Sequence, residues 1–280
     1  MLSPEILEFY RRGGETGRLS AGTGRLEFLR TWDILTRVLP PAPARIVDVG
    51  GATGVYAEPL AAAGYAVTVV DPVPEHVAAA GALPGVTAVQ GDARELPVPD
   101  SGADGVLLLG PLYHLTGRED RLRAWREAAR AARPGGVVAG AVISRFASLC
   151  DGFAKGFFAQ PGFAGIVAGA LADGVHRNPD AHPRWFTSAY FHHPAEPAAE
   201  AAEAGLTGVR TLAIEGPAWM SPHLPDFLDD PALTELTLTM LRRVEEEPSV
   251  AGTSSHLLTV GRVPIGLGYH TDVAADGVEA

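Results

Sequence analysis

The chain has 280 residues, of which 46% are hydrophobic and 20% charged, and its formal net charge is −11. This length and composition suit one large α/β domain with a substantial core. The negative charge argues against nucleic acid or an anionic membrane as the main partner, because no basic patch stands ready to displace counterions. The single cysteine, Cys150, excludes an internal disulfide and a cysteine-rich zinc site.

The first residues show no basic segment followed by a long apolar run, so the sequence predicts no signal peptide. No window approaches the ~18 consecutive apolar residues that a membrane span needs. A lone cysteine is compatible with a reducing compartment. We therefore expect a cytoplasmic protein.

Helices are predicted first, over 4–12 and 24–38, before a proline-rich break at 40–43. Strand and helix patterns alternate after that break. The predicted strands are 45–49, 66–70, 86–89, 105–109 and 136–143, and the predicted helices between them are 54–63, 74–80 and 118–132. Such alternation predicts a Rossmann-like, doubly wound parallel sheet with helices on both faces.

The alternation lapses over 144–197, a stretch rich in aromatic residues and histidines, which we interpret as an insertion that caps the strand ends. After this insertion, helix and strand patterns resume and complete the predicted sheet. The predicted elements there are a helix over 195–204, a strand over 208–214, a helix over 231–247 and a strand over 255–263. These elements predict a single domain over 1–264, followed by a tail, 265–280, that has no periodic pattern and that we expect to be mobile.

Three of the predicted strands end in glycines or carboxylates. Gly50 and Gly51 end the first strand and Gly54 opens the next helix, while Asp71 and Asp92 follow the second and third strands. In open α/β sheets ligands bind beyond the carboxyl ends of the strands. Glycines let a ligand approach the backbone, and the aspartate after the second strand is the expected acceptor for two ribose hydroxyls. We expect the carboxylate after the third strand to accept from an adenine amino group.

The charges of this region indicate the kind of cofactor. No lysine or arginine occurs between Arg45 and Arg94, so the predicted rim is purely acidic. An acidic rim disfavours pyrophosphate and suits a cofactor that carries positive charge, such as S-adenosylmethionine. Pro72 and Val73 would pack on its adenine, and Ala93 would place a backbone N–H near the ring.

Two other nucleotide-binding classes are excluded by their fingerprints. The NAD fingerprint needs glycines at the first, third and sixth positions of a window. A window from Gly50 has Ala52 and Val55 at the later positions, and a window from Gly51 has Thr53 and Tyr56. A P-loop is absent as well, since no Gly-Lys-Ser/Thr follows the glycines.

The chain resembles the class I S-adenosylmethionine-dependent methyltransferases, notably the branch with ubiquinone and menaquinone methyltransferases. The segments that carry the resemblance are 47–54, 70–72, 91–97, 109–115 and 133–136. Ala52 departs from the family pattern, which usually has glycine there. The resemblance implies a seven-stranded sheet whose last strand, 255–263, is antiparallel. It implies these further cofactor-binding residues: Asp48, Gly91, Leu109, Gly110 and Pro111.

The N-terminal segment, residues 1–40, looks like a helical lid found in relatives of this branch. There Tyr10 would close over cofactor and substrate, and Arg18 would bind the methionine carboxylate. The alternative is a surface helix with Tyr10 packed on the sheet. The N-terminal helices could also form the interface of a homodimer.

Methyl transfer is an in-line displacement on an activated carbon, so the protein needs a base only when the acceptor must lose a proton. His114, just past the fourth strand, is the candidate base, since an unshifted imidazole accepts protons near neutrality. In the family, the corresponding Tyr-His pair often contacts the cofactor without acting in the chemistry. Both roles stay open for His114.

Aromatic side chains of the insertion are predicted to wall the acceptor pocket, together with Tyr10 and Tyr113. These candidates are Trp185, Phe186, Tyr190, Phe191 and His192. Phe157 and Phe158 are predicted to form a separate hydrophobic mini-core. For Glu215-Gly-Pro217 two roles are open, approach to the substrate and a simple turn, and the turn is favoured. His176, His182, His192 and His193 lack the spacing of metal ligands, so no metal is predicted.

The sequence therefore predicts S-adenosylmethionine-dependent methyl transfer to an oxygen or nitrogen of a small hydrophobic or aromatic metabolite. The composition suggests a bacterial genome rich in G and C, and the resemblance implies an enzyme of natural-product biosynthesis. Two alternatives stay open, which are methylation of carbon on a similar substrate and a non-catalytic methyltransferase-like binding protein. Loss of Asp71, Asp92 or the glycines would favour the binding protein, and none is lost.

Overall fold

The computed structural model describes residues 17–180 and 182–265. The predicted helix over 4–12, Tyr10 and all but the first residue of the predicted tail lie outside this range. No helix of the described part combines the length and the apolar character that a bilayer crossing would require.

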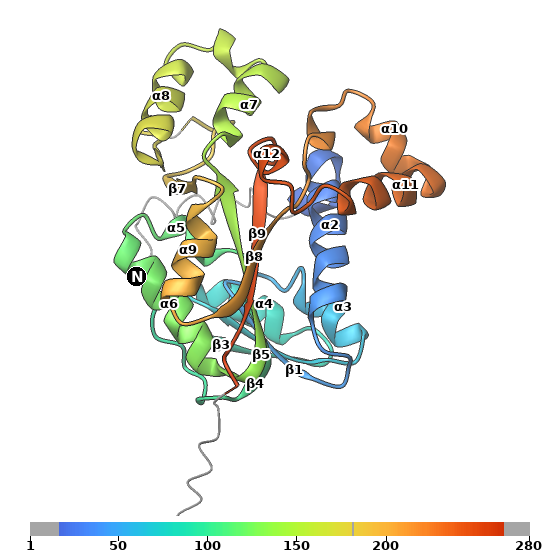
Figure 1. Cartoon of the computed structure of the whole chain (residues 1–280), viewed down its shortest axis with the longest axis vertical. Coiled ribbons are helices and arrows are strands. Elements are labelled where there is room, and N and C mark those ends of the chain that lie inside the picture. The colour runs from blue at the N-terminus through green and yellow to red at the C-terminus, as the bar shows by residue number, and fades with distance from the viewer. Residues whose placement is uncertain (1–16, 181, 266–280) are drawn as a thin grey trace, which may run out of the picture.

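A mostly parallel sheet forms the centre of the molecule, in the order β3-β2-β1-β4-β5-β9-β8 (Figure 1). The strands are β1 Arg45–Val49, β2 Ala66–Asp71, β3 Val86–Gln90, β4 Ala103–Leu108, β5 Ala132–Ser144, β8 Thr207–Ala213 and β9 His256–Arg262. β9 runs antiparallel to both of its neighbours, as the resemblance implies. The predicted Rossmann-like fold class is confirmed.

Helices cover both faces of this sheet because its strands bury alternate side chains on opposite faces. On one face Ile46 and Val67 pack with α2, Gly22–Val38, and α3, Ala57–Ala62. On the other face Val47, Val106 and Val138 pack against two helices, α6 Arg118–Ala131 and α9 Glu196–Glu203. The remaining helices that flank the sheet are α4 Pro74–Gly81 and α5 Pro111–His114.

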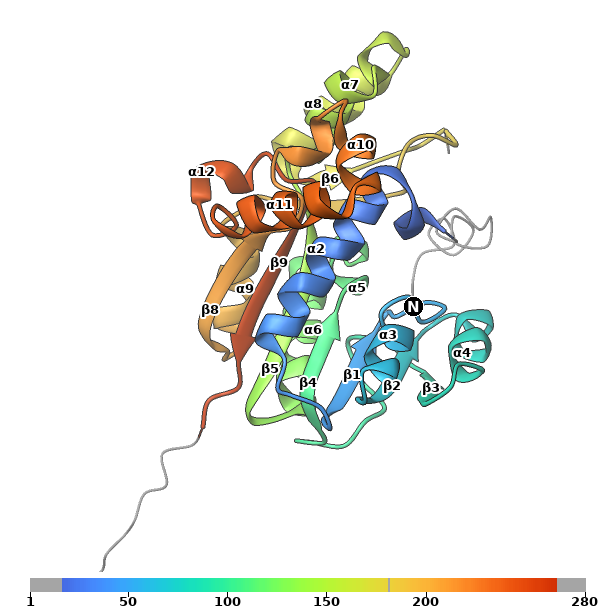
Figure 2. The same cartoon turned by 90° about the vertical axis from the view of Figure 1, so that its right-hand side faces the viewer.

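The insertion stands above the carboxyl ends of the strands (Figures 1 and 2). It contains α7 Ala147–Ala154, α8 Phe163–Asp173 and a short antiparallel pair, β6 Val175–His176 and β7 Ala189–His192. β7 also pairs in parallel with the last residues of β5, so nine described strands join in one sheet. The sequence did not predict β6 and β7, because such short strands leave no periodic signal.

Opposite the insertion, α10 Leu224–Asp229, α11 Pro231–Arg242 and α12 Pro248–Ala251 flank the start of β9 (Figure 1). The predicted helix over 231–247 was too long. The chain leaves the helix after Arg242 because Glu245 turns inward, where its carbonyl accepts from Ala213 N–H at 2.7 Å. Its carboxylate bonds Arg30.

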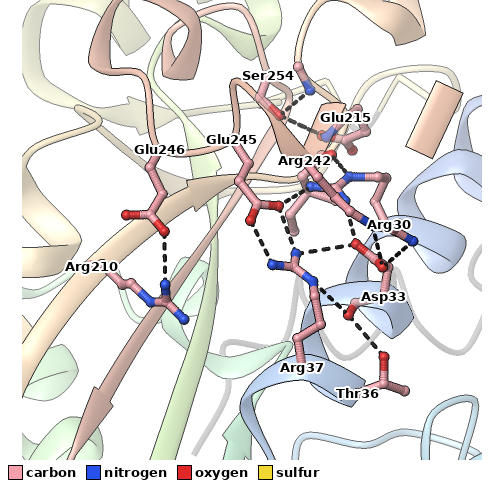
Figure 3. Close-up of polar contacts among 12 residues, drawn as sticks. Arg30, Asp33, Thr36, Arg37, Arg210, Glu215, Arg242, Glu245, Glu246 and Ser254 are labelled. Carbon is pink, nitrogen blue, oxygen red and sulfur yellow. Dashed lines mark hydrogen bonds and ion pairs between the residues drawn. The ribbon is translucent and has the colours of Figure 1, made fainter. Parts of the chain in front are cut away.

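A buried charge network fixes α2 against this C-terminal part (Figure 3). Arg30, with no exposed side-chain surface, donates to Asp33 and Glu245, both at 2.6 Å, and to the carbonyl of Ile214. Arg37 and Arg242 add further ion pairs to the same two carboxylates. Because buried charges are costly unless paired, this network holds α2 in one position beside the ends of β8 and β9.

Candidate functional site

A crevice lies at the carboxyl ends of β1, β2, β3 and β4, where the sequence places its glycines and carboxylates; we call it the strand-end crevice. Most of the predicted cofactor residues line it. They are Arg18, Asp48, Gly50, Gly51, Asp71, Pro72, Val73, Gly91, Asp92, Ala93, Leu109, Gly110 and Pro111, with Tyr113 and His114 beside them. Gly54 does not line the crevice, since its α-carbon faces Leu83, where a Cβ would lie 2.4 Å from a methyl group.

The loop after β1 is shaped by close approaches that only glycine allows. A Cβ on Gly50, whose φ is +69°, would lie 2.9 Å from Pro111, and one on Gly51 would lie 2.5 Å from Asp48. Ala52, where the family usually has glycine, adopts a φ of +50°. Its N–H donates to the Asp71 carboxylate at 3.0 Å, so the loop and the end of β2 are tied together.

Asp48 is the least satisfied group of the crevice. It has no exposed surface, and neither carboxylate oxygen has a hydrogen-bond partner in the described structure. Desolvation by burial, together with the charge of Asp71, raises the pKa of Asp48 to about 7. A buried carboxylate without a donor is costly, so this position favours a ligand that brings N–H groups or positive charge.

Asp71 is held firmly in place. Its oxygens accept from the N–H groups of Ala52 and Val73, and His76 Nδ1 lies 3.1 Å away. The hydrogen bond to Asp71 raises the pKa of His76. Each carboxylate oxygen has two acceptor sites, so Asp71 keeps capacity for ligand hydroxyls.

The rim of the crevice is not purely acidic, contrary to the prediction. Arg94 donates to both oxygens of Asp92, at 2.8 and 2.7 Å, and holds the pKa of Asp92 far below its usual range. Arg18 folds back onto Glu27 in the same manner. The prediction considered only the residues between Arg45 and Arg94. In the structure Arg18 and Arg94, which lie outside that stretch, also line the crevice.

A second cavity, of about 560 Å³, opens between the insertion, α2 and the start of β9; we call it the aromatic cavity. Three residues that were predicted to wall the acceptor pocket, Trp185, Phe186 and Phe191, line this cavity. Phe157 and Trp219, which were not predicted there, line it as well. Phe157 therefore belongs to a cavity wall as well as to the hydrophobic cluster that was predicted for it.

Tyr190 and His192 were predicted to wall the acceptor pocket but do not line either cavity. Alternate residues of a strand point to opposite sides, so both lie on the face of β7 that Phe191 avoids. Tyr190 packs under Arg121, 3.7 Å from ring centroid to guanidinium carbon. His192 is fully buried, with Nε2 3.4 Å from Glu200. Both side chains are part of the packing between β7, α6 and α9.

The two cavities meet at a small set of shared residues, which are Arg18, Glu27, Tyr113 and His256. His256 begins β9, and its Nδ1 lies 2.5 Å from Glu215 Oε1 and 3.6 Å from Glu27 Oε2. The sequence analysis missed His256 and Glu27, and at Glu215 it favoured a turn over an approach to the substrate. A usable signal existed, because antiparallel pairing places the end of one predicted strand beside the start of the next.

His114 lines the strand-end crevice and is buried. Desolvation lowers its pKa to about 3, so the imidazole is neutral at physiological pH but a weak proton acceptor. The alternative role, contact with a cofactor without participation in the chemistry, is therefore favoured for His114. Its role in catalysis stays a prediction.

The histidines of the insertion do not assemble a metal site in the described structure. His176 bonds Ser148, His182 stacks on Trp185, and His192 faces Glu200. Across residues 17–180 and 182–265, one group of three potential ligands occurs, formed by Glu27, Glu215 and His256, whose ligand atoms lie within 4.8 Å of one another.

Comparison with known proteins matches residues 47–140 to the family model of a methyltransferase domain. An uncharacterised methyltransferase of Mycobacterium tuberculosis is 39% identical over 100 residues, which cover 35% of this chain and 40% of that protein. The match thus spans about two fifths of the length of the curated relative. The family-model match, residues 47–140, includes most of the residues that line the strand-end crevice and, of those that line the aromatic cavity, Tyr113.

Solved structures extend the likeness to the whole fold. A S-adenosylmethionine-dependent methyltransferase from Methanosarcina mazei superposes with a TM-score of 0.56 at 15% identity, over 83% of this chain and 98% of its own. A methyltransferase from Haloferax volcanii, solved with its activator Trm112, gives a TM-score of 0.59 at 17% identity, over 94% and 100%. Residues 47–140 therefore match a methyltransferase domain, and the chain has the fold of the class I S-adenosylmethionine-dependent methyltransferases.

Proposed function

We propose that the protein transfers a methyl group from S-adenosylmethionine to an oxygen or nitrogen of a small hydrophobic or aromatic molecule, as an enzyme of bacterial natural-product biosynthesis. One observation carries the proposal. The strand-end crevice and the aromatic cavity meet at shared residues, so a donor in one would face an acceptor in the other. The matches to methyltransferases support the same reaction.

The residues of the strand-end crevice fit S-adenosylmethionine. The buried carboxylate of Asp48 lacks a donor, which a ligand ammonium would supply. Asp71 stands at the end of β2 with acceptor capacity for ribose hydroxyls. Pro72 and Val73 offer an apolar surface for the adenine ring. When bound, S-adenosylmethionine supplies an electrophilic methyl group on a positively charged sulfur.

The aromatic cavity suits a small acceptor with an apolar body. Trp185, Phe186 and Phe191 form apolar walls, while the charged groups Arg18, Glu27 and His256 gather where the cavities meet. Such a site holds the acceptor by burial of apolar surface and orients its polar atom at the charged end. Rate enhancement would come mainly from this positioning, since the methyl carbon is already activated.

Two alternatives to this function can be distinguished from it. Methylation of carbon would need the same two cavities and differs only in the acceptor atom. A non-catalytic binding protein would keep the strand-end crevice without any need for an aromatic cavity that joins it. The second cavity therefore favours an enzyme.

Binding and turnover test the proposal separately. We expect calorimetry to detect S-adenosylmethionine and not NAD. Tritium from labelled S-adenosylmethionine should appear in an extract of small bacterial metabolites that contains hydroxyl and amine acceptors. Binding of NAD in the crevice would overturn the donor assignment. Donor binding with no methyl incorporation from any extract would favour the non-catalytic reading.

A further inference from the structure

His256 occupies an unusual position, because it lines both cavities and is also paired with carboxylates. His256 is the first residue of β9. Its partner Glu215 follows β8, and Glu27 lies on α2. The three meet because β8 and β9 are antiparallel, with Ala213 opposite Leu257. The charge network around Arg30 holds α2 against the same strand ends.

We infer that His256, oriented by Glu215, is the group that accepts the proton of an acceptor hydroxyl during methyl transfer, and that the positive charge of S-adenosylmethionine prepares it for this role. The inference rests on the proposed function. It moves the catalytic assignment from His114, at the floor of the strand-end crevice, to a residue at the junction of the cavities.

The first argument is the orientation of the imidazole. Its Nδ1 lies 2.5 Å from Glu215 Oε1, so the proton on Nδ1 donates to that carboxylate. Glu215 is itself fixed, because Oε2 accepts from the backbone N–H of His256 at 3.0 Å and lies 2.8 Å from Ser254 Oγ. A carboxylate that holds one ring nitrogen sets the tautomer and leaves the other nitrogen as the acceptor.

The second argument is access. The side chain of His256 is 21% exposed, although it begins a strand whose next residue is fully buried. Its Nε2 has no hydrogen-bond partner among residues 17–180 and 182–265, and the ring lines both cavities. His114, by contrast, is 8% exposed. A group that is both oriented and accessible meets the geometric requirement for a general base.

The reaction balances with this residue alone. The acceptor oxygen bonds to the methyl carbon while the carbon–sulfur bond breaks and its electron pair remains on sulfur. The hydroxyl proton passes to Nε2 of His256. The positive charge thus moves from sulfur to an imidazolium that Glu215 and Glu27 flank.

Charged groups from every neighbouring element act on His256. They are Glu215 after β8, Glu27 on α2, Arg18 on the 3₁₀ turn before α2 and Asp151 on α7, which pairs with Lys155. Burial alone would lower the pKa of His256, but Glu27 and Glu215 outweigh it and raise this pKa to about 9. The pKa of a free phenol is about 10, so transfer of the proton from a phenolic hydroxyl to His256 changes the free energy little. An aromatic cavity is the expected surrounding for such an acceptor.

An imidazolium must first lose its proton before it can act as a base. A cation bound nearby lowers the pKa of an imidazole. S-adenosylmethionine is positively charged at sulfur, whereas its product S-adenosylhomocysteine is not. Binding of the donor, and not of the product, therefore converts His256 to its neutral, accepting form.

The same residues could in principle bind a divalent cation, but their pairing disfavours this. Arg18 donates to both oxygens of Glu27, at 2.5 and 3.0 Å, and thus neutralises one of the two carboxylates. Glu215 directs its oxygens at the backbone and ring of His256. A metal would have to displace these donors from both carboxylates.

Proton release on ligand binding tests the inference without an acceptor. Calorimetry at pH 8 in two buffers of different ionisation enthalpy gives the number of protons released by S-adenosylmethionine and by S-adenosylhomocysteine. We expect the donor to release about 0.5 proton more than the product. His256→Gln should abolish this difference, and the exposed His223→Gln should keep it.

A second variant covers the case in which His256→Gln does not fold. Glu215→Gln keeps the shape of the side chain and removes its charge, so the pH at which the extra proton is released should fall by about 1 unit or more. An unchanged difference in His256→Gln, or no shift in Glu215→Gln, would overturn the inference. Stoichiometric binding of Mg²⁺ or Mn²⁺ that cancels the proton difference would overturn it in favour of a metal site. Failure to bind S-adenosylmethionine at all would instead refute the proposed function.

Discussion

Asp48 in the strand-end crevice and the two glutamates at the border of the aromatic cavity, Glu27 and Glu215, are in opposite states. In the crevice, Asp48 is fully buried without a hydrogen-bond partner in the described structure. At the border of the aromatic cavity, Glu27 is paired with Arg18 and Glu215 with His256. An unsatisfied carboxylate raises the free energy of the folded protein until a ligand brings a donor. A paired carboxylate needs no ligand and instead sets the protonation of its partner.

This difference separates two functions within the proposed active site, which are binding of the cationic donor and proton transfer. In the crevice, Asp48 offers an unpaired carboxylate to a cation that arrives from solution. The junction keeps its charges balanced within the chain, so the group that changes protonation there is His256. Each prediction below removes one element of this contrast.

The largest effect is expected for His256→Gln. Loss of a general base should lower kcat at pH 8 by about 1,000-fold, which is about 4 kcal/mol, with little change in the affinity for S-adenosylmethionine. The acceptor found by tritium incorporation serves for the assay. His114→Gln should lower kcat by less than about 10-fold, since a pKa of about 3 makes His114 a weak acceptor. A larger loss in His114→Gln than in His256→Gln would reverse the assignment.

Arg30→Met tests whether pairing holds the junction together. Arg30 is fully buried and donates to Asp33, Glu245 and the carbonyl of Ile214, which precedes Glu215. Its removal leaves Asp33 and Glu245 with only the partly exposed Arg37 and Arg242 and deprives the Ile214 carbonyl of the Arg30 donor, so we expect the free energy of unfolding in urea to fall by about 3 kcal/mol. Arg25→Met, which breaks an exposed pair with Asp229, should cost less than about 0.5 kcal/mol. Equal effects would mean that the network around Arg30 contributes no more than a surface pair.

Asp71→Ala removes the acceptor that the crevice offers to ribose hydroxyls. We expect the affinity for S-adenosylmethionine to fall by about 100-fold, or about 2.7 kcal/mol, in calorimetry of a folded variant. Glu75→Ala is the matched control, since this exposed acidic residue lies in the first turn of α4, close in sequence to Asp71. Similar losses in both variants would point to the overall field of the crevice and not to a contact made by Asp71.

The sequence predicted the crevice better than the junction for a physical reason. Gly50 and Asp71 stand at the ends of strands that local apolar patterns reveal, and parallel strands bring their ends to one edge. Glu27, Glu215 and His256 come from three distant segments, and their meeting depends on how α2 packs and on how β8 pairs with β9.

The errors within predicted segments have the same origin. Tyr190 and Phe191 were assigned to the same wall, but alternation along β7 sends them to opposite sides. The short strand itself gave no periodic signal. Arg94 was seen only as the end of an acidic stretch, although its side chain returns to Asp92 and makes that part of the rim neutral.

The last prediction concerns Asp48, which the sequence identified by position but not by its lack of partners. The pKa of Asp48 is about 7 in the folded protein and 3.8 without burial. The folded state therefore favours the protonated form, and this group lowers stability as pH rises from about 4 to about 7, with the full cost above that range. Asp48→Asn cannot ionise, so it should be more stable than the wild type at pH 8, by at least about 1 kcal/mol, and equal to it near pH 4. Urea unfolding at both pH values measures this difference, and calorimetry should show weaker binding of S-adenosylmethionine, since an amide does not attract a cation. A loss of stability in Asp48→Asn at pH 8 would mean that the chain itself satisfies the carboxylate, and the contrast between crevice and junction would not hold.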